Sequence, residues 1–221
     1  MSGEVIEPLL KGSVITIQVT VLASILAAIV ALVAGAARLS RSWLIRTVAG
    51  IYIEVFRGTS VLVQLYFAYF VLPLFGLELT PLTAGVLAIG LNSGSYGAEI
   101  VRGAVQAVPK GQVEAATVLG MSPWKRFRHV VLPQALVIIL PSAGNQLIDL
   151  LKLTSLVSLI TLADITFEAQ ALRTTYGDTL QIFSAVLVFY FVLASGIAAG
   201  TRALERRVRR GIDAAGTGAV K

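Results

Sequence analysis

Long uncharged stretches alternate with short charged segments along this 221-residue chain. A helix needs about 20 apolar residues to cross a bilayer, and five stretches are long enough. The predicted membrane-spanning helices cover residues 14–37, 58–77, 79–98, 130–148 and 179–201. Residues 153–163 are also uncharged, but at 11 residues they are too short to cross a membrane alone. We expect them to extend the fourth helix or to lie at the membrane surface, and the role of residues 153–178 stays open.

The composition supports an all-α integral membrane protein that forms a single domain over residues 1–221. Hydrophobic residues make up 56% of the chain and charged residues only 14%, whereas a soluble domain carries about 25% charge. The chain has no cysteine, and His129 is its single histidine. Disulfides, thiolate metal sites and multi-histidine metal sites are therefore excluded. No nucleophile–base pair occurs at helical spacing, so we expect neither catalytic residues nor a metal site.

The positive charges indicate the orientation in the membrane. Lysine and arginine residues gather on one side of the predicted helices, at Arg38, Arg41, Arg46, Arg102, Lys110, Lys125, Arg126, Arg128, Arg202, Arg206, Arg207, Arg209 and Arg210. Basic residues at the ends of apolar spans mark the cytoplasmic side. This places the loop 104–129 and the C-terminus in the cytoplasm and the N-terminus outside, as an odd number of spans requires. The net charge of +6 therefore indicates topology, and we expect no nucleic-acid partner.

The loop from Val113 to Pro133 is the longest charge-bearing interval within the apolar chain, and its pattern predicts two short helices joined by a corner. Gly120 suits the left-handed position that ends the first helix. Ser122 suits the N-cap of the second helix, and Pro123 suits its first position. Pro133 is expected to break or kink the second helix. A corner held between two membrane helices predicts a docking surface.

The same loop resembles the EAA signature of importer-type ABC transporter permeases. The resemblance rests on Glu114-Ala115-Ala116, on Gly120 four residues later and on Val130-x-Leu132-Pro133. In that family the loop is the coupling helix, which sits in a groove of a cytosolic ATPase. The resemblance therefore implies an ATPase-coupling role for Glu114, Ala115, Ala116, Gly120, Leu132 and Pro133.

Three further stretches resemble the polar amino-acid uptake branch of these permeases, which includes histidine-, glutamine- and arginine-type permeases. They are Glu54-x-x-Arg57-Gly58-Thr59, Tyr96 to Gly103, and Gly144-Asn145 through Lys152 to Leu156. Ser60 and Leu153 depart from the branch, which usually has proline and an acidic residue there. Ectoine-type relatives also exist, so the resemblance keeps this zwitterionic osmolyte as an alternative cargo.

The resemblance implies a type I importer (MetI-like) permease fold with five transmembrane helices in the bacterial cytoplasmic (inner) membrane. The chain would be the permease subunit that moves a polar amino acid or related zwitterion inward by alternating access. Its expected partners are membrane lipid, a cytosolic ATPase dimer, a second permease (a copy or a paralogue) and an extracytoplasmic solute-binding protein. The chain has no G-x-x-x-x-G-K sequence, so the ATPase subunits would bind the ATP, and we expect no cofactor and no enzymatic activity here.

Polar residues within the spans are the candidates for the substrate path, because such groups are costly in lipid unless they have partners. These candidates are Glu99, Asn145, Asp149 and Lys152. Glu99 can instead form a structural or gating ion pair with Arg102, and Asp149 can pair with Lys152. A structural ion pair is expected between Glu54 and Arg57. The alternative function is a stand-alone ion-coupled carrier or channel, for which Glu99 and Asp149 are the candidate relay residues. The cargo, the symmetry of the pathway and direct substrate contact by this chain stay open.

Overall fold

The computed structural model describes residues 3–217, and within that range every regular element is helical. The α-helices are α1 (Gly3–Arg38), α2 (Trp43–Gly58), α3 (Val61–Tyr66), α4 (Pro81–Gln106), α5 (Lys110–Val118), α6 (Pro123–Arg126), α7 (Leu132–Leu153), α8 (Ile165–Tyr176) and α9 (Thr179–Thr217). Two π-helical turns cover Phe67–Val71 and Phe127–Val131, and two 3₁₀ helices cover Leu72–Phe75 and Thr154–Ile160. The expected all-α architecture is therefore confirmed.

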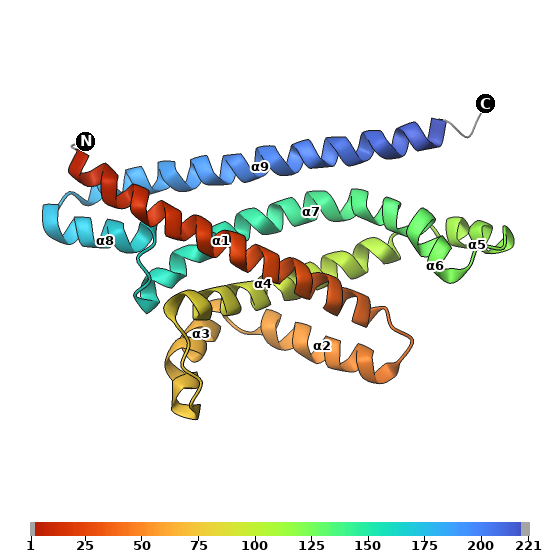
Figure 1. Ribbon diagram of the computed structural model, residues 1–221, viewed down its shortest axis with the longest axis horizontal. Coiled ribbons are helices and arrows are strands. Elements are labelled where there is room, and N and C mark those ends of the chain that lie inside the picture. Colours follow the sequence, from red (N-terminus) through yellow and green to blue (C-terminus); the bar gives the residue numbers. More distant parts are fainter. Residues whose placement is uncertain (1–2, 218–221) are drawn as a thin grey trace.

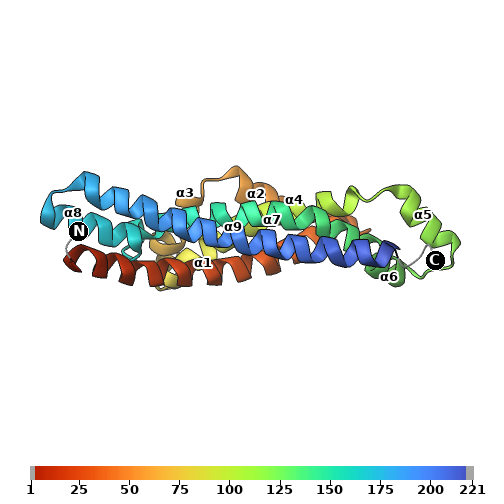
Figure 2. The ribbon, with the colours of Figure 1, turned by 90° about the horizontal axis from the view of Figure 1, so that it is seen from above.

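The long helices run side by side along one axis and form an elongated bundle (Figures 1 and 2). Helix α1 begins at one end of this bundle, next to α8 (Figure 1). Helices α5 and α6 lie at the opposite end, toward which α9 also runs (Figures 1 and 2). The predicted docking loop and the C-terminal helix end therefore lie on one side of the bundle, away from the start of α1.

Small residues let α1 and α4 pack closely. A Cβ atom added at Gly90, Gly94 or Gly97 of α4 would lie 2.7–2.8 Å from side-chain atoms of α1. The facing residues are Leu26, Val30 and Ala31. Close backbone approach at small residues stabilises helix pairs in membranes, where the hydrophobic effect does not drive association. This glycine-rich face makes α1 and α4 the central pair of the bundle.

The second predicted span, 58–77, differs from the structure. Helix α2 already begins at Trp43, ends at Gly58, and is followed by a helical segment Val61–Phe75 at an angle of 102°. In Figure 1 this second segment extends sideways from the bundle. The sequence prediction begins this span after Arg57, the last charged residue before the uncharged stretch, and therefore leaves out α2, which carries Arg46, Glu54 and Arg57. The bend depends on side-chain hydrogen bonds from outside α2, which are described below.

Pro133 does not end the helix that contains it. The chain continues from α6 through the π-helical turn into α7, and residues 123–160 form one 38-residue helical stretch. The wide turn is closed by a hydrogen bond from Leu132 N to Phe127 O, and Pro133 lies in the first turn of α7. A π-turn at this point accommodates the missing proline N–H. At the other end, the 3₁₀ helix Thr154–Ile160 extends α7, which is one of the two arrangements expected for residues 153–163.

Three described helices are long and apolar enough to cross a membrane, at Val5–Arg38, Pro123–Ile160 and Thr179–Val208. The bent pair α2–α3 adds a fourth if it is counted as one span. Helix α4 is not among them, and small and polar residues such as Gly90, Asn92 and Ser93 lower its hydropathy. The number of five spans therefore stays a prediction.

Candidate functional site

Local sequence signals fix the corner between α5 and α6, which we call the coupling corner (residues 110–126). Gly120 adopts φ +71°, as expected for the residue that ends α5. Its N–H donates to Thr117 O and the next N–H, of Met121, donates to Ala116 O. These two bonds form a Schellman motif. The Ser122 hydroxyl then accepts from Lys125 N, and Pro123 begins α6. The predicted conformation of the corner is confirmed.

The coupling corner presents an apolar surface at the tip of the bundle. Val118, Leu119 and Trp124 expose 88%, 77% and 66% of their surfaces, although each is large and hydrophobic. Glu114 and Ala115 are exposed beside them, whereas Ala116 is buried. Large apolar side chains exposed together in one short segment are typical of a protein interaction site. Leu132 and Pro133, in contrast, lie half-buried at the start of α7 and continue the helix that supports the corner.

Glu99 lies in a cluster with two arginine residues where α1 and α4 pack together. Arg102 donates from Nε and Nη2 to the Glu99 carboxylate, at 2.9 and 2.6 Å. Arg38 of α1 approaches the same carboxylate to 3.8 Å and also donates to Arg46 O at 3.4 Å. The three charges therefore join α1, the start of α2 and α4. Of the two roles considered for Glu99, the geometry favours the ion pair with Arg102.

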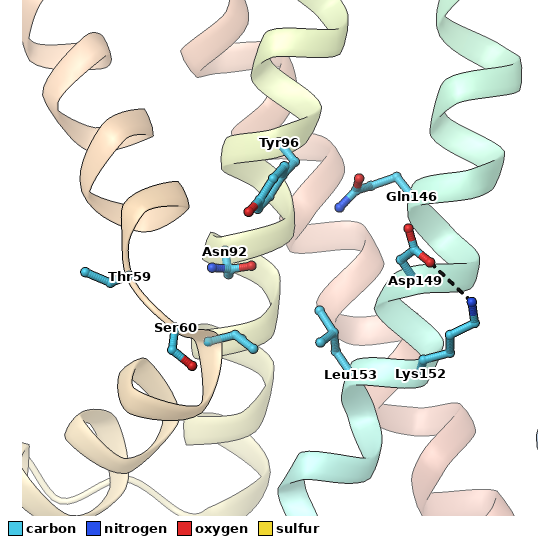
Figure 3. Close-up of a pocket in the computed structure, with 9 residues that line it drawn as sticks. Thr59, Ser60, Asn92, Tyr96, Gln146, Asp149, Lys152 and Leu153 are labelled. Atoms are coloured by element: carbon cyan, nitrogen blue, oxygen red, sulfur yellow. Dashed lines mark hydrogen bonds and ion pairs between the residues drawn. The ribbon is translucent and has the colours of Figure 1, made fainter.

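A polar cavity of about 460 Å³ lies between the α2–α3 break, α4 and α7 (Figure 3). Seven of its nine lining residues carry a polar side chain, at Thr59, Ser60, Asn92, Tyr96, Gln146, Asp149 and Lys152. We call this cavity the polar pocket. Its volume lies in the range of sites that hold small molecules. Two other cavities within the described residues have an apolar lining, so the polar pocket is the stronger candidate for a polar ligand.

Opposite charges lie on the α7 wall of the polar pocket. Lys152 Nζ lies 3.4 Å from Asp149 Oδ1, and both side chains are about two-thirds exposed (Figure 3). An exposed pair of this kind contributes little to stability, so either partner is able to turn toward a ligand. The structure thus brings together two of the predicted path residues.

Asn145 lies apart from them. It lines a separate cavity of about 190 Å³ between α7 and α9, whose other lining residues include Arg202. The spacing of four residues predicts that Asn145 and Asp149 share one helix face, but residues of α9 line the cavity at Asn145 and none lines the polar pocket at Asp149. Glu99 is also not among the lining residues of the polar pocket.

The expected ion pair between Glu54 and Arg57 is wrong for the described residues. The Arg57 guanidinium lies 5.0 Å from the centre of the Tyr96 ring, and Glu54 is exposed. A cation above an aromatic face gains about 0.5–1 kcal/mol at exposed sites. The arginine therefore contacts α4 at the edge of the polar pocket, and the helical spacing of the two charges did not decide their pairing.

A second buried polar junction lies between α1, α8 and α9. Asp164 is fully buried and caps α8, because its carboxylate accepts from Phe167 N at 2.9 Å. Thr16 of α1 accepts from Ile165 N, and Tyr190 of α9 donates to Asp164 at 3.4 Å. Burial raises the pKa of the Asp164 carboxyl from 3.8 to about 6. This residue lies outside the candidate spans and was not predicted as a site.

Sequence reasoning missed Ser60, Asn92, Tyr96 and Gln146 as residues of the polar pocket. The available signal was polarity, because Asn92 and Gln146 are amides within predicted apolar spans. The positions that share the pocket, however, come from elements far apart in sequence, so the pattern along one helix could not group them.

Comparisons with known proteins show which family and which proteins the chain resembles. Residues 21–210 match the family model described as "Binding-protein-dependent transport system inner membrane component". The chain is similar to a probable amino-acid ABC transporter permease protein of Sinorhizobium fredii, with 45% identity over 92% of this chain and 88% of the relative. It is also similar to the glutamine transport system permease protein of Escherichia coli, with 41% identity over 91% of this chain and 93% of the relative.

Two solved structures share the fold. A chain from the crystal structure of an amino acid ABC transporter with histidines has a TM-score of 0.85 and 37% identity, covering 91% of this chain and 94% of that chain. A chain from the methionine ABC transporter in an inward-facing conformation has a TM-score of 0.79 at 19% identity, covering 94% and 99%. The predicted importer-type permease fold is therefore confirmed.

Proposed function

The chain belongs to the family of binding-protein-dependent transport system inner membrane components, and from this premise we propose that it is the permease subunit of an ABC importer for a polar amino acid or a related zwitterion. The family places the protein in the inner membrane. The single observation that carries the proposal is the coupling corner, which combines a fixed backbone conformation with an exposed apolar surface at one end of the bundle.

The partner proposed for the coupling corner is a cytosolic ATPase dimer. The exposed side chains of Val118, Leu119 and Trp124 offer apolar area for the contact, and Glu114 offers a charge beside it. Burial of such residues stabilises a complex by about 25 cal/mol per Å² before the costs of association are subtracted. ATP binding and hydrolysis are assigned to that partner, so the permease needs no cofactor and is not an enzyme.

A second permease and an extracytoplasmic solute-binding protein complete the proposed complex. The family description, "binding-protein-dependent", supports the binding protein. The second permease, a copy or a paralogue, would supply the other half of a pathway. Closure of the ATPase dimer would move the two coupling corners together and switch the permeases between inward-open and outward-open states as rigid bodies.

The proposed cargo site is the polar pocket. It presents a cation and an anion, Lys152 and Asp149, together with neutral hydrogen-bonding groups. An amino acid carries a carboxylate and an ammonium, so a zwitterion complements this wall without a net change of charge. Relatives named for amino acids and for glutamine support an amino-acid cargo, and ectoine, also a zwitterion, stays an alternative.

Co-purification from native membranes tests the proposal. The tagged chain is expected to bring down an ATPase with a Walker motif, and Glu114→Lys is expected to remove it. Glu78→Lys is the matched control, because Glu78 is equally an exposed glutamate but follows the lateral segment Val61–Phe75, away from the corner. Recovery of the chain alone, with uptake into liposomes that does not depend on ATP, would support the stand-alone carrier.

A further inference from the structure

The break between α2 and α3 leaves helix carbonyl groups without their usual partners. Helix α2 ends at Gly58 and the chain turns by 102°, so the carbonyls of its last turn lose the N–H groups that a continuing helix would supply. Side chains replace them. The Thr59 hydroxyl donates to Val55 O at 2.8 Å, and Phe56 O accepts from both Gln64 and Asn92, at 2.9 and 2.8 Å. We call Thr59, Gln64 and Asn92 the break network.

The donors and acceptors of the break network can be assigned in only one way. Val55 O is a backbone acceptor, so the single proton of the Thr59 hydroxyl is committed to it and the hydroxyl must accept from Gln64 Nε2, at 2.7 Å. The other end of the Gln64 amide, Oε1, is then an acceptor, and Asn92 Nδ2 donates to it at 3.2 Å. The same Nδ2 donates to Phe56 O. A reversed Asn92 amide would place two oxygen atoms against each other in both contacts.

This assignment determines which end of the Asn92 amide faces the polar pocket. Its amide nitrogen uses both protons inside the network, so only the carbonyl oxygen is left. In Figure 3 the nitrogen points to the α2–α3 side and the oxygen points across the pocket toward α7. Only 5% of the Asn92 surface is exposed, and within residues 3–217 no side chain donates to this oxygen. Asn92 lines the polar pocket, so this oxygen is an acceptor that a ligand in the pocket can reach.

We infer that Asn92 is a cargo-contacting residue whose fixed carbonyl oxygen accepts an N–H from the ammonium group of the cargo. This inference rests on the proposed function of the polar pocket. It also predicts selectivity. Because the Asn92 amide cannot turn over, its oxygen always faces the pocket and disfavours a zwitterion whose nitrogen carries no hydrogen. Asp149 across the pocket compensates the positive charge of the ammonium, and Lys152 is then free to meet the carboxylate. The cargo class is an amino acid with a free ammonium group, and quaternary betaines are excluded.

A cycle of variant and ligand tests the contact. The permease is assembled with its ATPase subunits in nanodiscs without the binding protein, and binding of the twenty standard L-amino acids is measured by calorimetry. The tightest binder is then compared with its N,N,N-trimethyl derivative, on the wild type and on Asn92→Leu, which keeps the bulk and removes the acceptor. The wild type is expected to prefer the free ammonium by at least about tenfold, because a hydrogen bond to a charged group is lost.

On Asn92→Leu the preference is expected to fall to within about threefold. Once the Asn92 carbonyl oxygen is removed, taking the N–H groups off the ligand costs no further hydrogen bond. Ser93→Ala is the matched control: it truncates the adjacent buried polar residue of α4, whose hydroxyl has no partner and which lines an apolar cavity instead. It should keep the preference of the wild type.

Each outcome is decisive. An unchanged preference in Asn92→Leu, or equal affinities on the wild type, would overturn the contact while leaving the pocket as the cargo site. Binding of no amino acid would contradict the proposed cargo itself. If Asn92→Leu fails to assemble, Asn92→Ala gives the same comparison, because Phe56 O then keeps its bond from Gln64 and no apolar bulk is placed beside it.

Discussion

The coupling corner and the polar pocket are built in different ways. In the corner, the bonds that set the chain direction join residues three to five positions apart, such as Met121 N to Ala116 O. In the pocket, the bonds join residues 28 and 36 positions apart, from Asn92 to Gln64 and to Phe56 O. The corner is exposed and held by bonds between residues close in sequence, whereas the pocket is held by side-chain bonds that join different helices.

The difference separates the two tasks of a transporter subunit. A corner whose shape depends on its own residues is able to transmit a push as a rigid body while the helices behind it rearrange. A pocket whose walls belong to α2–α3, α4 and α7 changes shape whenever those helices move relative to one another. Under the proposed function, the ATPase contact would lie on a local unit and cargo binding on a composite one, which suits an alternating-access mechanism.

The largest expected effect comes from Gly120→Val. A β-branched residue at φ +71° costs up to about 3 kcal/mol, so the corner should lose its conformation, and co-purified ATPase should fall by at least tenfold. Gly111→Val is the control, since Gly111 also has open space around it but lies within α5 with no positive φ. Equal ATPase recovery from the two variants would show that the corner is not held by its glycine.

The next effect concerns Asp164, which joins distant helices as the pocket does. Its folded pKa of about 6 lies above its ordinary value of 3.8, so the folded state binds the proton more tightly. The stability that this residue contributes is complete below about pH 4 and is lost as the pH rises from there through 6, by about 3 kcal/mol. Asp164→Asn stays neutral and can still accept from Phe167 N. Its Tm in detergent should exceed that of the wild type at pH 7.5, and the difference should shrink to near zero by about pH 4. A constant difference across this range would contradict the buried, proton-binding carboxyl.

A smaller effect is expected for Gln64→Leu, which removes a donor from Phe56 O and from the Thr59 hydroxyl. The loss should lower the free energy of unfolding by about 1–2 kcal/mol. Uptake should fall, while recovery of the ATPase should stay that of the wild type because the corner is untouched. If Gln64→Leu loses both uptake and the co-purified ATPase, the α2–α3 break and the coupling corner depend on each other. The distinction between the two regions would then be wrong.

The smallest effect on stability is expected for Asp149→Asn. The ion pair with Lys152 is exposed, so the free energy of unfolding should change by less than about 0.5 kcal/mol. The concentration of amino acid needed for half-maximal uptake should nevertheless rise, because the ammonium loses its counter-charge in the pocket. Wild-type uptake with an unchanged Tm would remove Asp149 from the cargo site.

The same contrast explains which parts the sequence could predict. Gly120, Ser122 and Pro123 act on their immediate neighbours, so their roles followed from their order in the chain. The first, fourth and fifth apolar stretches likewise predicted long helices. The bend after Gly58 could not be predicted, because its carbonyls are satisfied by Gln64 and by Asn92 of another helix. The pocket shared by Ser60, Tyr96 and Gln146 also results from helix packing. Packing of α2 against α4 likewise brings Arg57 to the Tyr96 ring, where it does not pair with the nearby Glu54.

The most direct test of the account is uptake of a radiolabelled amino acid into proteoliposomes that contain the permease, its co-purified partners and the binding protein. We predict uptake when ATP is enclosed in the vesicle lumen together with the ATPase, and no uptake with a non-hydrolysable ATP analogue. Gly120→Val is expected to lose this uptake, and Gly111→Val is expected to keep it. Uptake that continues without ATP, or that is equal in both glycine variants, would contradict the role of the coupling corner and the importer function built on it.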